Sequence, residues 1–463
     1  MTMQIDRRAL VVGGGVAGLL SARVLADRYG EVIVVDRDHL PDDDSTPRRG
    51  VAQGRHAHAL LARGQQMLDG LFPGLTETLV ERGALRGDVL DDTRMYLGGH
   101  RLLPSRSGLV AVSASRALIE GCLRARVRAL PGVQLRDRCD VVGLTASPDG
   151  RRITGARLLR RDGDSAEEVL EAGTVVDASG RSSRAAVWLG GLGVDGPEED
   201  RVPIDVAYAT RRYRLGPAAL GGDLAVINAP TPRHPRAGVL AMVEGGEAMV
   251  TLAGILGDRP PTDPPGFVAF AESLQFPDIA AAIVDAEPVD DPVPYRFPAA
   301  VRRRYDRVRG LPDGFAVTGD SLCSSNPIYG QGMSVAALGA RELQRHLDRY
   351  GRLRTDRFHQ SLAQKLGPPW QLATGADLAF PGVGDPGTAQ RLVGRYVSRA
   401  HAAAAQDPAV ARAVVRVSGL VDGPASLVRP SMVVRVLGRR SRPSPASRSG
   451  VEVSGTGRSP AGA

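Results

Sequence analysis

Three glycines near the start of the chain have the spacing of a turn that binds the phosphates of a dinucleotide. They are Gly13, Gly15 and Gly18, and the residues between the last two are Val16 and Ala17. The first glycine permits a tight turn, the second lets a pyrophosphate approach the backbone, and the third allows a helix to pack closely on a strand. The first N–H groups of that helix favour negative charge. All five residues are therefore predicted to contact a dinucleotide.

A carboxylate and two apolar runs place this turn in a strand–helix–strand unit. Residues 9–13 and 32–35 are typical of buried parallel strands, and residues 16–28 have apolar side chains at helical spacing. Asp36 follows the second strand, 18 residues beyond Gly18, where an acid can accept hydrogen bonds from the adenosine ribose. An acid there favours a cofactor without a phosphate on that ribose, such as FAD or NAD. A glycine turn that only allows close packing is the alternative.

A second motif follows the apolar run 315–318. Its Gly-Asp pair ends a predicted strand, so the carboxylate can accept hydrogen bonds from sugar-like hydroxyls. A proline then redirects the chain into a helix, whose first N–H groups would stabilise negative charge on a redox ring. A strand–loop–helix joint without a ligand is the alternative. The predicted cofactor contacts of this segment are Gly319, Asp320, Pro327, Gly330, Gly332 and Met333.

A strand that runs into a turn of small residues lies between these two motifs. It covers residues 175–184 and includes Asp177 and Gly180, which we predict to approach the cofactor. A turn in which the Asp177 side chain bonds to its own backbone explains the same residues.

The composition is that of a folded protein and excludes several classes. The chain has 463 residues, 43% of them apolar, and its three cysteines form no disulfide or metal-ligating pattern. We expect a cytoplasmic protein without a bound metal. No apolar run approaches the ~20 residues of a membrane helix, and the N-terminal apolar run is interpreted as a strand rather than an export signal. Of the formal charge of +8, +4 follows Gly438, so an arginine-rich surface explains it better than a nucleic-acid site.

The three motifs, in this order, resemble those of the FAD-dependent monooxygenases with the p-hydroxybenzoate hydroxylase fold, over about residues 8–350. Two positions depart from that family. Asp177-Ala-Ser-Gly180 replaces the more common Gly-Ala-Asp-Gly, and Cys323 stands where a histidine is usual. The resemblance implies FAD as the cofactor.

The same resemblance implies further cofactor contacts. Asp36 and Arg37 would hold the adenosine end, Arg116 would lie near the pyrophosphate, and the backbone of Val141 would border the adenine. Arg48 or Arg49 falls in an Arg-Gly-Val loop that approaches the cofactor in relatives. A surface position explains each of Arg116, Arg48 and Arg49 as well.

The elements that position these motifs are predicted to form an α/β fold. The resemblance implies a discontinuous Rossmann-like FAD-binding domain over residues 1–200 and 310–350. A mainly β substrate domain is inserted at 201–309, where strand patterns dominate, and a helical region follows at 351–437. Residues 438–463, rich in Ser, Gly, Pro and Arg, are expected to be disordered.

Segments 49–61, 177–181, 206–211 and 319–333 carry a narrower resemblance, to the polyene epoxidases of polyether-ionophore pathways such as those of monensin and lasalocid. This similarity implies transfer of one oxygen atom from O2 to alkenes of a polyketide, polyene or terpenoid-like chain. The expected partner is thus a lipophilic small molecule.

Two histidines are the candidates for acid–base chemistry. His56 and His58 fall in a helical stretch predicted from about residue 56 to 71, and positions i and i+2 of a helix face different sides, so at most one can face the flavin. A capping or packing role is the alternative for both. Epoxidation of an alkene needs no base acting on the substrate, whereas phenol hydroxylation is helped by one.

The β-rich segment is predicted to form the floor of the substrate pocket. Val206, Tyr208 and Leu240 are its candidate lining residues, although a sheet that simply covers the core explains the same pattern. Because the chain has one dinucleotide fingerprint, NAD(P)H must bind transiently near the flavin, or a separate flavin reductase must supply the electrons.

Other functions of a FAD-binding chain stay open. They are a hydroxylase of an aromatic polyketide, a reductase that saturates isoprenoids, and a non-catalytic flavoprotein with residues 351–437 as an interaction module. A flavin-dependent halogenase is disfavoured because Lys365 is the only lysine and the two tryptophans, Trp188 and Trp370, stand far apart. Aerobic oxidation of a reduced cofactor, stimulated by a polyene or a phenol, would distinguish an oxygenase from a binding protein.

Overall fold

A parallel sheet of five strands, in the order β20-β11-β1-β2-β7, forms one half of the protein. It is seen in a computed structural model that describes residues 7–41, 48, 50–58, 60–161, 167–216 and 219–438. Every neighbouring pair in this sheet is parallel. The strands are β1 (Arg8–Val12), β2 (Glu31–Val35), β7 (Val133–Arg136), β11 (Thr174–Asp177) and β20 (Phe315–Val317). The predicted α/β fold with a Rossmann-like unit is confirmed.

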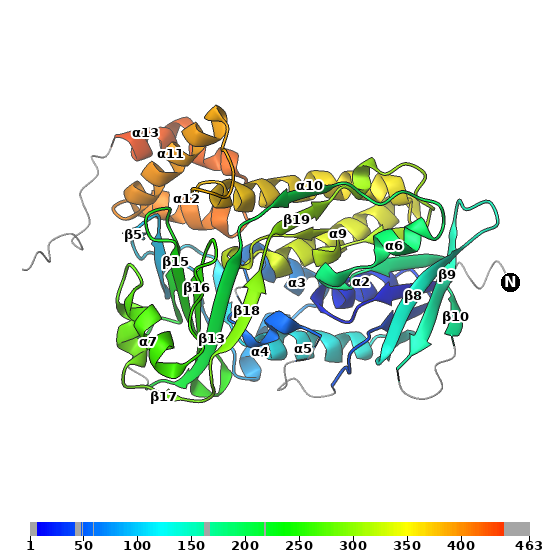
Figure 1. Ribbon diagram of the computed structural model, residues 1–463, viewed down its shortest axis with the longest axis horizontal. Helices are drawn as coiled ribbons and strands as arrows, with labels where there is room; N and C mark the ends of the chain where they lie inside the picture. The colour runs from blue at the N-terminus through cyan, green and yellow to red at the C-terminus, as the bar shows by residue number, and fades with distance from the viewer. Residues whose placement is uncertain are drawn as a thin grey trace, which may run out of the picture.

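Elements on both sides of this sheet explain why its strands are apolar along their length. The last four residues of β1 and of β2 are all buried, as in strands covered on both faces. Helix α2 packs against α5 and α9, and the antiparallel sheet β8–β10 contacts β2 and β11 (Figure 1). These elements are α2 (Val16–Ala26), α5 (Arg116–Arg128), α9 (Gly332–Tyr350), β8 (Cys139–Ala146), β9 (Ile153–Arg160) and β10 (Glu167–Glu171).

The turn between β1 and α2 requires glycine at two positions. Gly13 has a φ of +103°, and a Cβ added there would lie 2.5 Å from the carbonyl oxygen of Ala178. A Cβ on Gly18 would lie 1.7 Å from the carbonyl oxygen of Gly13. Only glycine therefore lets α2 approach β1 and β11 this closely.

A larger, mostly antiparallel sheet forms the other half of the protein (Figure 1). Its path is β17-β13-β16-β15-β14-β4-β5, and β18 also pairs with β13. Its strands are β4 (Thr93–Leu97), β5 (His100–Arg101), β13 (Val206–Arg214), β14 (Ala225–Asn228), β15 (Arg236–Met242), β16 (Glu247–Gly254), β17 (Glu287–Pro288) and β18 (Val293–Phe297). Strands β4 and β5 precede residue 200, so this sheet extends beyond the segment predicted for it, through the parallel pairing of β4 with β14.

The two faces of the larger sheet have different neighbours. One face carries Val226, Leu240 and Leu252, which are buried together with apolar residues of α7 (Pro264–Glu272) and α8 (Asp278–Ile283). The side chains that alternate with these point to the opposite face, toward the parallel sheet and the C-terminal helices.

Helices dominate the chain after α9. Helix α10 (Thr355–Asp377) runs beside α9, and α11 (Thr388–Ala404), α12 (Pro408–Ser418) and α13 (Pro430–Leu437) gather at the end of the molecule opposite β8–β10 (Figure 1). The other described helices and strands are α3 (Ala62–Leu71), α4 (Leu75–Glu81), α6 (Ala185–Gly190), β3 (Leu85–Asp88), β6 (Val110–Ser113), β12 (Glu199–Val202), β19 (Ala300–Arg303) and β21 (Cys323–Ser324).

The helix predicted from residue 56 begins later, at Ala62. His56 has φ −110° and ψ 161°, which is extended backbone. The larger sheet holds this segment out of the helix, because Thr210 binds the His56 ring and the Ala57 N–H donates to Thr251 Oγ1 at 3.1 Å. The argument that the two histidines face different sides of a helix was therefore wrong.

Two further expectations concern the ends of the chain and the membrane. The tail that was predicted to be disordered, after Gly438, lies outside the described residues. Within the described residues, no helix has both the length and the apolar character needed to cross a bilayer.

Candidate active site

A cavity of about 1210 Å³ lies between the parallel sheet, the larger sheet and the C-terminal helices. Pockets for a single small ligand commonly measure about 300–1,000 Å³, so this one has room for a dinucleotide and a second molecule. The predicted cofactor residues that line it are Gly13, Gly15, Val16, Ala17, Asp36, Arg37, Arg116, Val141, Gly180, Gly319, Asp320, Pro327, Gly330, Gly332 and Met333. Segments more than 300 residues apart in sequence thus meet around one space.

The glycine turn forms one end of the cavity. Gly15 is the N-cap of α2, and a Cβ added there would meet, apart from its chain neighbours, only Arg48 Nη2 at 3.8 Å. Its surroundings are therefore open toward the cavity. Gly18 does not line the cavity but faces Gly13, so the structure gives it the packing role alone.

The carboxylate of Asp36 is held in place by the protein. Its Oδ2 accepts hydrogen bonds from the Gly14 N–H at 2.6 Å and from Arg48 Nη1 at 3.1 Å. Arg48 Nε also donates to Glu120 on α5 at 2.6 Å, and the side chains of Arg48 and Glu120 are each 5% exposed. Arg48 thus ties the end of β2 to α5 beside the cavity, whereas Arg49 lies outside the described residues.

Arg116 is positioned by the start of α5. Ser115 is the N-cap of that helix, and its hydroxyl accepts from the Leu118 N–H at 3.1 Å. Arg116 Nε donates to Glu120 one turn later at 3.3 Å, which leaves the rest of the guanidinium beside the cavity. This placement gives Arg116 the position of a group that can meet a pyrophosphate.

Of the two predicted cofactor residues in the middle motif, one stabilises the turn and the other lines the cavity. Asp177 is fully buried, and its carboxylate accepts hydrogen bonds from Ser179 and Ser183. It does not line the cavity, so it stabilises the turn, as the alternative interpretation of this motif held. Gly180 does line the cavity, and a Cβ added there would meet no atom within 4 Å.

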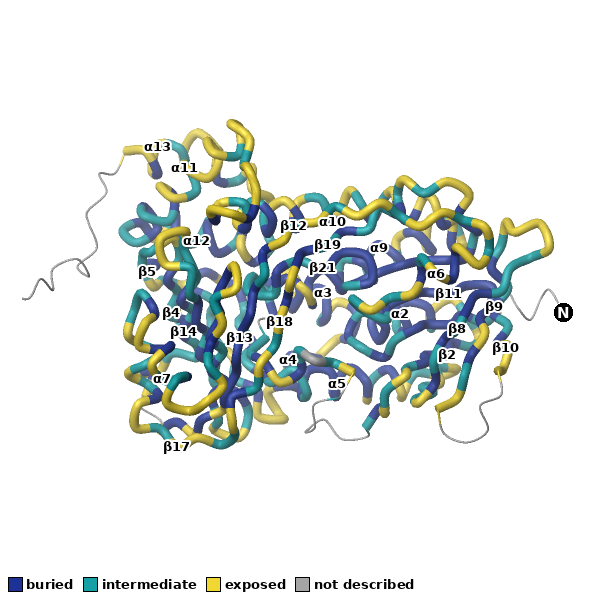
Figure 2. The backbone as a smooth tube through the Cα atoms, in the orientation of Figure 1, coloured by how far each residue is buried: buried dark blue, intermediate teal, exposed yellow. Residues whose placement is uncertain are grey.

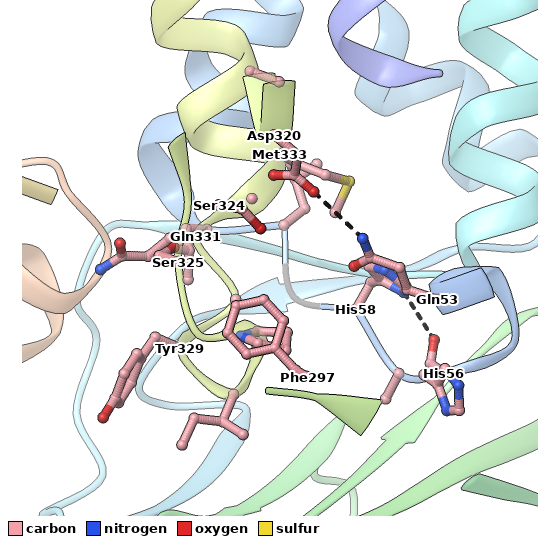
Figure 3. A pocket seen from close by; sticks show the side chains of 18 of the residues that line it. Gln53, His56, His58, Phe297, Asp320, Ser324, Ser325, Tyr329, Gln331 and Met333 are labelled. Carbon is pink, nitrogen blue, oxygen red and sulfur yellow. Dashed lines mark hydrogen bonds between the residues drawn. The ribbon is translucent and has the colours of Figure 1, made fainter. Parts of the chain in front are cut away.

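The late motif brings a carboxylate and a helix start to the middle of the cavity (Figure 3). Gln53 Nε2 lies 3.4 Å from Asp320 Oδ2 and is the one hydrogen-bond donor to this carboxylate among the described residues. Burial raises the pKa of Asp320, while Arg116 opposes that rise. Met333 lies beside Asp320 in the first turn of α9.

The two candidate histidines are neutral at physiological pH. Burial, together with a smaller effect of the Arg55 charge, lowers the pKa of His56 to about 4. Burial likewise lowers the pKa of His58 to about 3, with Arg116 adding to the effect. The ring of His56 binds Thr210 Oγ1 at 2.7 Å through Nδ1, while its Nε2 is buried without a partner among the described residues. Neither histidine carries the charge of a general acid at neutral pH.

His58 points back to its own loop rather than to a distant partner. Its Nδ1 donates to the carbonyl oxygen of His56 at 2.8 Å (Figure 3). Together with the bonds to Thr210 and Thr251, this bond fixes the extended segment 56–58 against the larger sheet beside the cavity.

Residues of the larger sheet line one wall of the cavity, but only one of the three residues predicted as the floor of the substrate pocket is among them. Tyr208 lines the cavity, whereas Val206 and Leu240 are fully buried and do not. On β15 the neighbours of Leu240, Val239 and Ala241, face the cavity instead. The proposal of Val206 and Leu240 as substrate contacts is therefore corrected.

Several lining groups were not singled out from the sequence. Phe297 lies with its ring 4.4 Å from the guanidinium of Arg181, and Arg181 Nη1 donates to the hydroxyl of Tyr295 at 3.0 Å. Gln53 could have been found from its place in the polar loop next to the histidines. The others carry no local signal, because strand and turn residues of these types are common.

The C-terminal helices form the far wall of the cavity, which the sequence did not reveal. Their lining residues come from α10, the loop after it, α11, α12 and the segment 424–428, and they include Leu372, Phe380, Val393, Tyr396, Val397, His401, Val415, Leu427 and Val428. The region predicted as a possible interaction module is thus part of the cavity wall.

The lining residues fit FAD. Added Cβ atoms at Gly180 and Gly332 would enter open space, so backbone can approach a ligand at both turns. Asp320 offers a carboxylate for hydroxyl groups, and the amide oxygen of Gln331 at the start of α9 is buried without a donor among the described residues. Phosphates, sugar hydroxyls and a ring with N–H donors would satisfy these groups.

Comparison with known proteins agrees with this fit. No family model matches the chain. It is 34% identical to Protein Rv3254 of Mycobacterium tuberculosis over 392 residues, which are 80% of this chain and 80% of the relative.

Solved structures with a similar fold are flavoproteins. A flavoprotein/dehydrogenase from Cytophaga hutchinsonii has a TM-score of 0.65 at 16% identity, covering 93% of this chain and 96% of its own. PqsL, a probable FAD-dependent monooxygenase from Pseudomonas aeruginosa, has a TM-score of 0.61 at 17% identity, covering 85% and 99%. The p-nitrophenol 4-monooxygenase PnpA from Pseudomonas putida has a TM-score of 0.62 at 17% identity, covering 91% and 99%. The chain therefore belongs to the same protein family as Protein Rv3254, and it has the p-hydroxybenzoate hydroxylase-like fold of FAD-dependent monooxygenases.

Proposed function

We propose that the protein is a FAD-dependent monooxygenase that transfers one oxygen atom from O2 to an uncharged, lipophilic small molecule. The finer proposal is epoxidation of alkenes in a polyketide, polyene or terpenoid-like intermediate. The observation that carries both is the division of the cavity into a charged part, suited to the dinucleotide, and an uncharged part beyond it.

The charged lining residues come from the three motifs, the loop after β2, the start of α5 and strand β8. Among the described residues they are Asp36, Arg37, Arg48, Arg116, Asp140, Arg181, Arg184 and Asp320. The part between the larger sheet and the C-terminal helices is lined instead by residues such as Met95, Ile227, Val239, Val397 and Leu427. A substrate with a carboxylate or phosphate would lose its hydration there without gaining a partner, so a neutral apolar substrate is favoured.

The chain's own residues would bind and orient the two molecules. FAD, when bound and reduced, supplies the activation of O2. Arg116 and the start of α2 would hold its phosphates, while Asp320 and the start of α9 would hold the ribityl chain and the ring end. Phe297, Tyr208 and the helical wall would exclude water from the space where substrate meets the ring. Alkene epoxidation asks for no base at the substrate, and both histidines are uncharged at neutral pH.

Electrons would come from NAD(P)H bound transiently near the flavin, or from a separate flavin reductase. The support for this is the presence of one dinucleotide fingerprint in the chain. The three cysteines, Cys122, Cys139 and Cys323, are buried and form no disulfide bond with one another, as we would expect of a protein in a reducing, cytoplasmic setting.

The test is oxygen consumption by the purified, FAD-loaded protein with NADH, NADPH, or either one with a flavin reductase. We expect a linear polyene to stimulate uptake and to gain one atom of labelled oxygen per epoxide. A phenol that is hydroxylated while polyenes stay inert would support the aromatic hydroxylase instead. A protein that binds FAD but consumes no oxygen with any of these substrates would contradict the proposal and favour a binding role.

A further inference from the structure

The mouth of the uncharged part of the cavity is bordered by exposed aliphatic side chains. Val393 on α11 and Val428 in the segment 424–428 both line the cavity, yet they are 61% and 57% exposed. Leu392, also on α11, is 60% exposed. Val434 and Leu437 on α13, which packs against α11, are 71% and 50% exposed.

These five residues form what we call the apolar rim: Leu392, Val393, Val428, Val434 and Leu437. They make up half of the ten large hydrophobic side chains that are exposed in the described part of the chain. Figure 2 shows exposed residues along α11 and α13, which project at one end of the molecule. Aliphatic groups gathered in this way on a surface mark a contact with a partner or a lipid phase.

Arginines stand beside the apolar rim. Arg391, Arg395 and Arg399 follow one another at intervals of four residues, which places them along one side of α11. Arg391 pairs with Asp385 at 3.0 Å, whereas Arg395 and Arg399 are exposed and no carboxylate of the described chain lies within ion-pair distance of them. On a turn of 3.6 residues, Leu392 lies on the same side of α11 as Arg399, whereas Val393 lies on the side turned away from Arg391 and Arg395.

The net charge of the whole chain is concentrated in the last part of the sequence. Residues 379–438 hold seven arginines and three aspartates, a balance of +4, and residues 439–463 hold five arginines and one glutamate, again +4. Together they account for the full formal charge of +8, so residues 1–378 carry no net charge. An electrostatic partner of this region must be anionic.

We propose that the apolar rim and the arginines of α11 dock on the surface of an anionic phospholipid bilayer, with the mouth of the cavity facing the lipid. Aliphatic side chains would enter the boundary of the acyl chains while arginines contact the lipid phosphates, which is the chemistry of an interfacial helix. This proposal rests on the proposed function only for the identity of the substrate that would enter the cavity. A lipophilic substrate dissolved in the bilayer would then reach the cavity without crossing water.

A bilayer fits these observations better than an acidic protein. The exposed groups of the apolar rim are valine and leucine, whereas the centres of protein interfaces are enriched in aromatic residues and methionine. Two residues of the apolar rim, Val393 and Val428, also line the uncharged part of the cavity, so a protein seated on them would hinder the entry of a substrate there.

The test is co-sedimentation of the FAD-loaded full chain with vesicles, in the absence of substrate. One set of vesicles contains phosphatidylcholine alone, and the other contains phosphatidylcholine with phosphatidylglycerol. We expect at least about tenfold stronger partitioning to the anionic vesicles, since each arginine near such a surface contributes about a fivefold gain, and we expect added salt to weaken it.

Charged substitutions test whether vesicle binding depends on the apolar rim or on exposed aliphatic residues anywhere on the surface. Leu392→Glu combined with Val434→Glu puts two anions into the apolar rim at residues that do not line the cavity. The matched control is Val187→Glu combined with Val284→Glu, whose side chains are 62% and 60% exposed on other elements. We expect the rim variant to lose at least about tenfold in partitioning and the control to keep it. Circular dichroism and the ratio of FAD to protein should match the wild type in both.

Three results would overturn the proposal. They are equal partitioning of the wild type to neutral and anionic vesicles, equal loss in the rim variant and its control, and a dimer in sedimentation velocity that the rim variant dissolves while no vesicles are bound. The last result would assign the apolar rim to a second copy of the chain. Because no turnover is measured, failure here leaves the proposed oxygenase activity untouched, and failure of that activity leaves vesicle binding untouched.

Discussion

The Asp377 carboxylate at the end of α10 accepts a hydrogen bond of 2.8 Å from the hydroxyl of Tyr329, a residue that lines the cavity. The same oxygen accepts from Asn326 Nδ2 at 2.8 Å, while the other carboxylate oxygen is buried without a partner among the described residues. Asp377 thereby ties the loop that leads into α9 to the C-terminal helices. The position of this cavity-lining loop depends on a side chain about 50 residues away in sequence.

Asp377→Asn should flatten the pH dependence of stability. Burial raises the pKa of Asp377 from 3.8 to about 6, so the folded protein holds a proton there that the unfolded chain has lost. The contribution of this group to the free energy of unfolding therefore falls as pH rises from about 4 through about 6, by up to about 3 kcal/mol. Urea unfolding of both proteins on either side of the folded pKa measures the difference. Parallel curves for wild type and variant would contradict it.

His56→Phe should cost stability but little turnover. The new ring keeps the packing against Tyr208 and Tyr295 and loses the bond to Thr210, which is worth about 1 kcal/mol. Because the pKa of His56 is about 4, against 6.5 in the unfolded chain, the wild type also loses stability as pH falls below about 6.5, and the variant should not. We expect kcat to fall less than about tenfold, whereas loss of a general acid or base costs about a hundredfold or more. Steady-state rates across the neutral range decide between these roles.

Gly15→Val and Gly332→Val should weaken FAD binding and leave the fold intact. An added side chain meets almost no protein atom at either position, so it projects into the space predicted for the cofactor. We expect FAD affinity to fall at least about tenfold, or about 1.4 kcal/mol, in a fluorescence titration. Gly70→Val is the matched control, since its Cβ also meets nothing within 4 Å but lies on α3 away from the cavity. An unchanged affinity in the two cavity variants would place the cofactor elsewhere.

Asp320→Asn should weaken FAD binding without lowering the stability of the apoprotein. A hydrogen bond from a hydroxyl to a charged acceptor is worth about 1.5–3 kcal/mol, so the affinity should fall about tenfold to a hundredfold. Removal of a buried charge leaves the unliganded fold equally stable or more stable, because burial already raises the pKa of this group. Asp285→Asn, an exposed position outside the cavity, should bind FAD as the wild type does. A similar loss in both variants would mean that the effect is one of net charge.

The sequence by itself determined the α/β class, the glycine turn and the ends of β1 and β2. Its signals there are local: four apolar residues in a row, three glycines at fixed spacing, and an acid after the second strand. Backbone sterics and helix-end electrostatics act over a few residues, so these short patterns are sufficient to predict the local structure.

Only the tertiary structure decided which side chains of the larger sheet border the cavity. The alternation along β15 showed that neighbours point to opposite faces, but it could not show that Leu240 packs under α7 and α8 while Val239 meets the cavity. In the same way, nothing local placed β4 in the larger sheet or α11 at the mouth. The alternation along a strand shows which side chains share a face. It does not show what that face packs against, because this depends on distant elements of the fold.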